Sequence, residues 1–129
     1  MFAKVFGAGI FGLNGTLIDV EVDIANGIPA LEIVGLPDAA VREAKERVKA
    51  AIRNAGFEFP CRRITVNLAP ADLRKDGSAL DLPIALGILS ATGQLGECDL
   101  SRTVMVGELS LDGQVRNIAV VLPMAVLFR

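Results

Sequence analysis

A lysine and a serine lie three residues apart in a loop that follows a run of apolar residues. The pair is Lys75 and Ser78, and Asp72, Asp76 and Asp81 surround it. Such a pair could act as a Ser-Lys dyad, in which a neutral amine accepts the proton of the attacking hydroxyl. The amine is neutral near pH 7 only where burial lowers the pKa of the lysine. On a polar loop, beside two carboxylates, Lys75 is instead expected to be solvated and charged with an ordinary pKa.

Other chemistries find little support in the residue types. The chain has no histidine, which removes Ser-His and Cys-His dyads and histidine-rich metal sites. It has neither a P-loop sequence nor a G-x-G-x-x-G sequence, so no cofactor site is predicted in it. Cys61 and Cys98 are expected to be free thiols, because nothing suggests a secretory context. The acidic residues at 19, 21 and 23 alternate with apolar ones, which is typical of a solvated sheet face and not of a metal site.

A basic patch is the remaining candidate for binding. Arg62 and Arg63 precede a predicted strand, and Arg74 and Lys75 follow it. The net charge of −2 argues against strong stand-alone binding to nucleic acid, so such a role would depend on this local patch. The alternative is that these are solubility charges paired with nearby carboxylates. No aromatic interleaving of the kind that stacks single-stranded bases is expected.

The order of elements predicts an α/β domain. Residues 18–24 alternate apolar and acidic, as in a half-buried antiparallel strand, after a hairpin turn at Asn14-Gly15. Asp38 is expected to cap an amphipathic helix that ends at Gly56, with charged side chains on a solvated outer face. Asp81 is expected to cap a second helix, apolar nearly all round, that ends at Gly93. Further strands are predicted at 4–11, 64–68 and 103–107, and a short buried strand at 30–34. A hairpin tip is expected at Asp112-Gly113 and a helix from residue 120 onward.

Length and hydropathy set the context. At 129 residues with 52% hydrophobic residues, the chain is expected to form one domain with one core. No apolar run approaches the roughly 20 residues that span a bilayer, and no signal-peptide pattern is present, so a cytoplasmic protein without membrane contact is expected. The last predicted helix has no cap before Arg129, which suggests a domain truncated at its C-terminal end.

Four segments resemble the N-terminal domain of bacterial magnesium-chelatase-like ATPases, the competence-associated ComM/YifB family. They are residues 34–43, 64–73, 81–86 and 107–113, and the resemblance that they carry covers essentially the whole chain. The resemblance implies a fold similar to domain 2 of ribosomal protein S5 and to the proteolytic domain of Lon, with a mixed four- or five-stranded sheet packed by two main helices. It also implies an AAA+ ATPase module beyond residue 129, which would bind ATP and Mg²⁺. The whole protein is then expected to be a ring, a hexamer, acting as a DNA helicase for branch migration in natural transformation.

The resemblance to Lon bears on the dyad. Residues 75–79 are similar to the Lys-Asp-Gly-Pro-Ser-Ala-Gly loop that presents the serine of Lon-type proteases, with the proline missing, so Ser78 is the nucleophile candidate. Alignment of residues 107–118 with the segment before the catalytic lysine places Leu122 at the lysine position. Leucine cannot accept a proton, so the resemblance implies a degenerate dyad. Ser78 is then expected to serve as a loop or capping hydroxyl.

Three functions follow for this chain. The favoured one is a non-catalytic accessory domain of an AAA+ ATPase that remodels DNA, with Arg62, Arg63, Arg74 and Lys75 as possible contacts to nucleic acid or a partner. The first alternative is a peptidase that depends on Ser78. The second is a pure oligomerisation or docking module without DNA contact.

Overall fold

The structure, a computed structural model, describes residues 1–11, 14–75 and 77–116. Within them lie two helices and six strands: β1 (Phe2–Phe11), β2 (Asn14–Ala25), β3 (Ala30–Val34), α1 (Ala39–Asn54), β4 (Arg63–Ala69), α2 (Asp81–Ala91), β5 (Glu108–Leu109) and β6 (Val115–Arg116). The predicted Leu122 position, the predicted helix from residue 120 and Asp76 lie outside the described residues.

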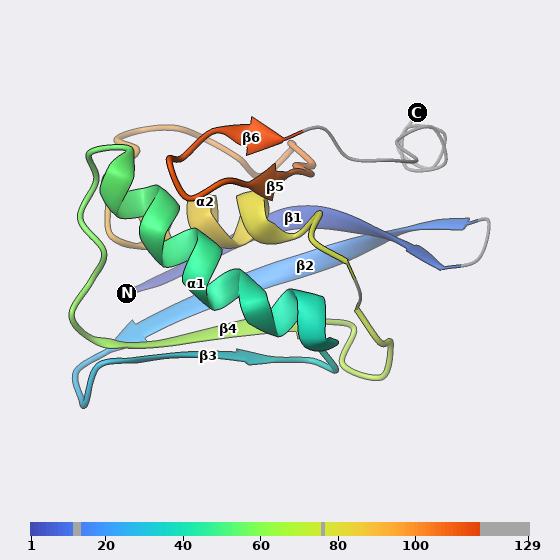
Figure 1. The fold of residues 1–129 in the computed structure, drawn as a ribbon. Coiled ribbons are helices and arrows are strands. Elements are labelled where there is room, and N and C mark those ends of the chain that lie inside the picture. Colours follow the sequence, from blue (N-terminus) through green and yellow to red (C-terminus); the bar gives the residue numbers. More distant parts are fainter. Residues whose placement is uncertain (12–13, 76, 117–129) are drawn as a thin grey trace.

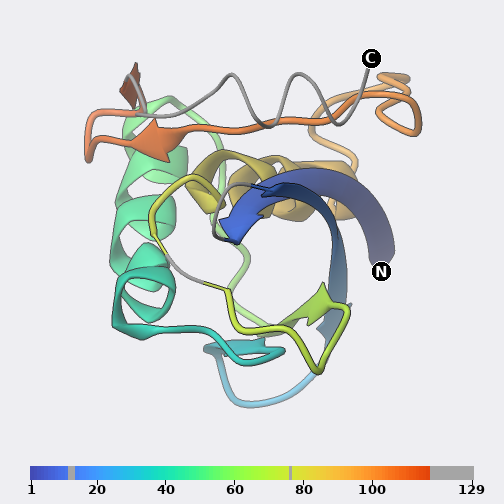
Figure 2. The same ribbon diagram turned by 90° about the vertical axis from the view of Figure 1, so that its right-hand side faces the viewer.

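The main sheet has four strands in the order β1-β2-β4-β3. β2 pairs antiparallel with β1 and β4, whereas β3 pairs parallel with β4. A parallel pair needs a long crossover connection, and α1 supplies it. Both helices lie on the same side of the sheet (Figure 1), and β1 and β2 curve beside α2 (Figure 2). The predicted mixed α/β architecture is therefore confirmed.

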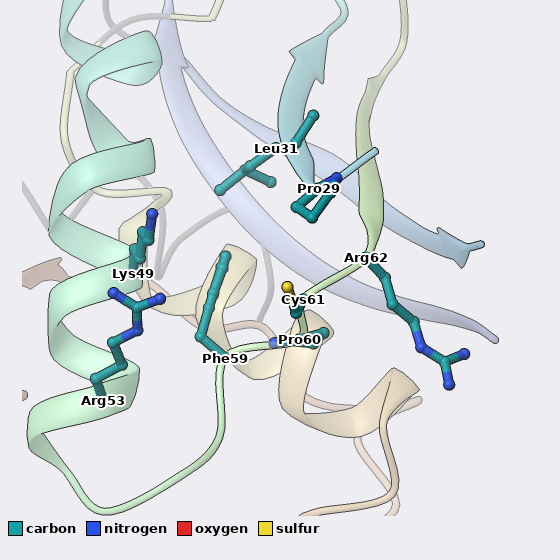
Figure 3. A pocket seen from close by; sticks show the side chains of 9 residues that line it. Pro29, Leu31, Lys49, Arg53, Phe59, Pro60, Cys61 and Arg62 are labelled. Atoms are coloured by element: carbon teal, nitrogen blue, oxygen red, sulfur yellow. The ribbon is translucent and has the colours of Figure 1, made fainter. Parts of the chain in front are cut away.

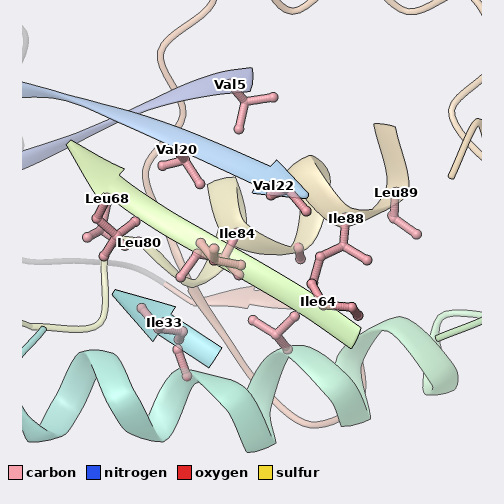
Figure 4. Packing of buried hydrophobic residues seen from close by; sticks show 14 of the residues in the cluster. Val5, Val20, Val22, Ile33, Ile64, Leu68, Leu80, Ile84, Ile88 and Leu89 are labelled. Atoms are coloured by element: carbon pink, nitrogen blue, oxygen red, sulfur yellow. The ribbon is translucent and has the colours of Figure 1, made fainter. Parts of the chain in front are cut away.

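The core lies between the sheet and the helices (Figure 4). In β2 the four apolar residues from Ile18 to Ile24 are buried, while the acidic residues between them face away from the core. Alternation in β4 buries Ile64, Val66 and Leu68 in the same way. The helices bury a stripe of α1 and most of α2 against them, including Val41, Ala44, Val48, Ala51, Ile52, Ile84, Ile88 and Leu89. The hydrophobic periodicity thus predicted the core correctly.

α1 begins and ends as predicted. The Asp38 carboxylate accepts a hydrogen bond of 2.8 Å from the backbone N–H of Val41, which satisfies one of the orphan donors of the first turn. Gly56 follows the helix with φ +93°, the left-handed conformation of a C-terminal cap. The outer face is mostly solvated, but Arg47 turns inward and is only 20% exposed.

Four local predictions were wrong. Asn14 and Gly15 belong to β2, paired with Phe11 and Ile10, so they do not form the turn of this hairpin. β3 is a partly exposed edge strand in which only Ile33 is buried, because the sheet ends there among the described residues. The helix α2 has Leu80 as its N-cap residue, without a side-chain cap, so neither Asp81 nor the Ser78 hydroxyl fills that role.

The fourth wrong prediction is the strand at 103–107. Only Val104 makes a bridge, to Phe6 of β1, with the N–H of Met105 donating to the carbonyl of Phe6. Gly107 instead bonds the start of α2, since its N–H donates to Ala79 and its carbonyl accepts from Leu82. Because of these hydrogen bonds, the backbone of residues 103–107 does not pair as a regular strand. The hairpin around Asp112-Gly113 forms as predicted, joining β5 and β6.

Candidate functional site

Lys75 is buried, contrary to the prediction of a solvated side chain. The side chain is fully buried, and its Nζ donates a hydrogen bond to the backbone carbonyl of Pro70. Burial lowers the pKa of Lys75, and the charge of Asp72 opposes this effect only in part. The prediction of an ordinary pKa was therefore also wrong, because the loop folds back over its own lysine.

The backbone of Lys75 joins two loops of the domain. Its N–H donates to the carbonyl of Leu36 at 2.9 Å, and its carbonyl accepts from the N–H of Asp38 at 2.8 Å. A parallel bridge pairs Lys75 with Pro37 at the same point. The loop after β4 is thus fixed to the turn that leads from β3 into α1.

Ser78 lies near this lysine in sequence without contacting its amine. Its side chain is half-buried, its carbonyl accepts from the N–H of Asp81 at 3.2 Å, and within the described residues no hydrogen bond joins its hydroxyl to Lys75. The amine that could serve as a base is directed at a backbone carbonyl. In this arrangement the lysine organises the loop, and the serine has no activating partner among the described residues.

Beneath the start of α2 lies an ion pair that the sequence did not reveal. Arg47 of α1 contacts both carboxylate oxygens of Asp81, which is 1% exposed, at 2.6 and 3.0 Å. The hydrogen bond to Asp81 is the main cause of the raised pKa of Arg47. Asp81 also accepts from the N–H of Leu109 in β5, and Arg47 donates to the carbonyl of Ala40. The pair holds α1, α2 and β5 together, and it is a structural element and not a reactive one.

The predicted basic patch is divided by the fold. Arg62 and Arg63 are exposed at the beginning of β4, whereas Arg74 is exposed beyond its far end and Lys75 is buried. The seven residues of β4 at about 3.3 Å each put roughly 20 Å between the two ends. Arg62 and Arg63 therefore cannot form one patch with Arg74, and Lys75 does not offer its amine to a ligand.

A different basic cluster forms around Phe59 (Figure 3). Lys49 and Arg53, one turn apart on α1, lie 6.0 and 5.9 Å from the centre of the Phe59 ring. A hollow of about 250 Å³ lies here, and Arg62 and Cys61 line it as well. It shares Arg53, Phe59, Pro60, Cys61 and Arg62 with a second hollow of about 580 Å³ that extends to Phe57, Glu58, Thr92 and Gln94. We call the two adjoining hollows the Phe59 groove.

The sequence carried a signal for this groove that the sequence analysis missed. Residues 57–63 read Phe-Glu-Phe-Pro-Cys-Arg-Arg, which places two aromatic residues directly before two arginines. The two rings precede the arginines without alternating with them, so the pattern of interleaved aromatic and basic residues is absent here. Lys49 and Arg53 line the Phe59 groove only because α1 packs beside residues 57–62.

Metal ligands and membrane-spanning helices are not found in the described part of the chain. No group of three or more Cys, Asp or Glu side chains in residues 1–11, 14–75 and 77–116 is placed to hold a metal ion. Both cysteines are free, as predicted, and both are exposed. Neither described helix is long and apolar enough to cross a membrane.

Comparison with known proteins identifies the family. Residues 20–129 match the model of the ChlI family, described as subunit ChlI of Mg-chelatase. This chain belongs to the ChlI family. Among curated relatives of this ChlI-family chain, Competence protein ComM of Haemophilus influenzae is 47% identical over 121 residues, which are 94% of the chain and 24% of the relative. YifB of Escherichia coli is 50% identical over 107 residues, 83% of the chain and 21% of the relative.

Lon is a more distant relative of this ChlI-family chain. Lon protease 2 of Bacillus subtilis is 28% identical over 137 residues, which cover 92% of the chain and 24% of the protease. The predicted magnesium-chelatase-like family and its weaker similarity to Lon are both confirmed. The chain spans about a quarter of the length of the curated relatives that it matches.

Proposed function

We propose that this chain is a non-catalytic accessory domain of a magnesium-chelatase-like AAA+ ATPase. The observation that carries the proposal is the 47% identity to ComM, which extends over 94% of the chain but only 24% of ComM. The chain contains no glycine-rich phosphate loop, so ATP and Mg²⁺ would be bound by another part of the longer protein, beyond residue 129.

The contacts of Lys75 support a role without catalysis. A Ser-Lys site needs a neutral amine within hydrogen-bond reach of the hydroxyl. The Lys75 amine is bound to the carbonyl of Pro70, and Ser78 makes no hydrogen bond with it. The other lysine position of a Lon-like site would fall on Leu122, which has no basic group.

The longer protein would be a ring-shaped cytoplasmic DNA helicase that promotes branch migration in natural transformation. The name of the Haemophilus relative, a competence protein, supports a role in the handling of incoming DNA. A hexameric ring with ATP sites in its AAA+ part would supply the motor. The present domain would add contacts to DNA or to neighbouring subunits.

Two measurements on the full-length protein test this function. Purified protein with ATP and Mg²⁺ should unwind a branched DNA substrate, and removal of ATP should abolish the unwinding. Absence of DNA-dependent ATPase activity and of unwinding would contradict the proposed role. A fluorophosphonate probe should leave Ser78 unlabelled, and labelling that disappears in Ser78→Ala would favour the peptidase alternative.

The docking alternative makes a different prediction. A pure oligomerisation module would leave DNA affinity unchanged when its exposed cations are replaced, while the assembly of the full-length protein would be altered by changes at its subunit contacts. Comparison of DNA affinity and its salt dependence between the wild type and cation variants separates the two functions.

A further inference from the structure

Positive charge gathers in the Phe59 groove of an otherwise acidic chain. Lys49, Arg53 and Arg62 line it, and in the part of the chain that the structure describes none of the three has a carboxylate within 4.0 Å. Glu58, at the wider end, is the one carboxylate among the lining residues. Three cations around a hollow attract a ligand with several negative charges.

Aromatic rings accompany these cations. Phe57 is 39% exposed and Phe59 is half-buried, and the α1 cations lie on one side of the Phe59 side chain while Cys61 lies on the other (Figure 3). An exposed phenylalanine ring beside a basic groove offers a flat apolar face to a planar ligand group. A nucleobase is such a group, and every base has a face that can stack.

The segment that carries the rings is held in place. The N–H of Phe57 donates to the carbonyl of Ile52 at 3.0 Å, which closes the end of α1. Gln94, after α2, both accepts from the N–H of Glu58 and donates to its carbonyl, each at 2.9 Å. Because these bonds order the segment before any ligand arrives, binding would not cost the entropy of ordering it.

We propose that the Phe59 groove binds a single strand of DNA. Lys49, Arg53 and Arg62 contact the phosphates, and a base stacks on Phe57 or Phe59. A single strand fits better than a duplex, because only unpaired bases present their faces to protein rings. An acidic peptide would satisfy the cations but would give the rings no flat partner. The proposal rests on the DNA-handling role proposed above and adds the site.

A binding measurement tests the groove. A fluorescein-labelled oligothymidylate of 20 nucleotides is titrated with the 129-residue chain at low salt, and binding is followed by fluorescence anisotropy. Arg53→Ala/Arg62→Ala should weaken binding at least tenfold and lower the salt slope by about 1.4, about 0.7 for each lost phosphate contact. Phe57→Leu, which keeps an apolar side chain without the ring, should weaken it at least fivefold. Arg102→Ala, at an exposed arginine that is not among the residues lining the groove, should stay within twofold.

Cys61 offers a second readout that does not depend on substitution. It is exposed and lines the groove, whereas Cys98 is exposed and does not line it. The oligonucleotide should slow maleimide labelling of Cys61 at least threefold and leave Cys98 unchanged. Equal protection of both thiols, or of neither, would contradict the groove as the binding site.

Other outcomes would overturn the proposal. The first is that Arg53→Ala/Arg62→Ala, with unchanged circular dichroism, binds the oligonucleotide with wild-type affinity. The second is that a duplex of the same sequence binds as tightly as the single strand. The third is that a polyglutamate peptide displaces the labelled oligonucleotide at a lower concentration than the unlabelled oligonucleotide does. If these occur while the full-length protein still unwinds branched DNA, the groove proposal fails and the proposed function stands. If the groove binds single strands but the full-length protein does not unwind branched DNA, the groove proposal stands and the proposed function fails.

Discussion

Arg47 and Asp81 form a two-pronged ion pair between the middle of α1 and the first residue of α2. The Nε and Nη2 atoms of Arg47 lie 2.6 and 3.0 Å from the two carboxylate oxygens of Asp81. The N–H of Leu109 also donates to this carboxylate at 3.1 Å. Asp81 therefore satisfies donors from two other elements within the core, so its removal affects more than one contact.

Asp81→Ala should lower the free energy of unfolding by about 3 kcal/mol, because it leaves a half-buried guanidinium and a buried N–H without their acceptor. Urea unfolding measures this change. Asp23→Ala, on the solvated face of β2, should change stability by less than about 0.5 kcal/mol.

The Arg47→Ala/Asp81→Ala double variant should be destabilised by clearly less than the sum of the two single variants, since the partners share one interaction. An additive result would mean that the pair contributes no coupling energy.

Lys75 should make stability depend on alkaline pH. Its pKa is lowered in the folded state by burial, so between that value and the ordinary value of about 10.4 the unfolded chain binds more protons. Stability contributed by this group therefore rises as the pH rises through that window. The free energy of unfolding of the wild type minus that of Lys75→Met should increase from pH 7 to pH 10.5.

The surface variant Lys49→Met removes the same charge from an exposed position and controls for general charge effects. A difference between the wild type and Lys75→Met that stays constant over this range would contradict the lowered pKa.

Gly35 should tolerate no side chain. It has φ +106°, and a Cβ there would collide with the backbone carbonyl oxygen of Leu68 in β4. Gly35→Ala should cost about 3 kcal/mol, from the left-handed conformation and the collision together. Gly56→Ala has similar backbone strain at φ +93° but open space around it, so it should cost only about 1 kcal/mol. Equal thermal shifts of the two variants would contradict the close approach.

Ser78→Ala should leave stability within about 0.5 kcal/mol of the wild type. Its hydroxyl makes no hydrogen bond in the described part of the chain, and α2 starts without a side-chain cap. A loss above 1 kcal/mol in thermal or urea unfolding would instead indicate the capping role expected from the sequence.

The sequence determined the elements whose patterns are local. Alternation between apolar and acidic residues in β2 fixed which side faces the core, because successive side chains of a strand point to opposite faces. The apolar stripe from Val41 to Ile52 and the Asp38 cap fixed α1 in the same way. The family also followed from the sequence, through ordered motifs that span most of the chain.

Only the tertiary structure decided what the charged residues do. In the sequence Lys75 and Arg47 look like solvated charges, and Asp81 looks like a helix cap. Each is buried or partly buried because a partner from a distant segment or a folded-back loop meets it. The predicted patch of four cations was divided because β4 separates its two halves. The Phe59 groove arose instead because the crossover through α1 brings Lys49 and Arg53 beside residues 57–62, and no local pattern encodes that distance between side chains.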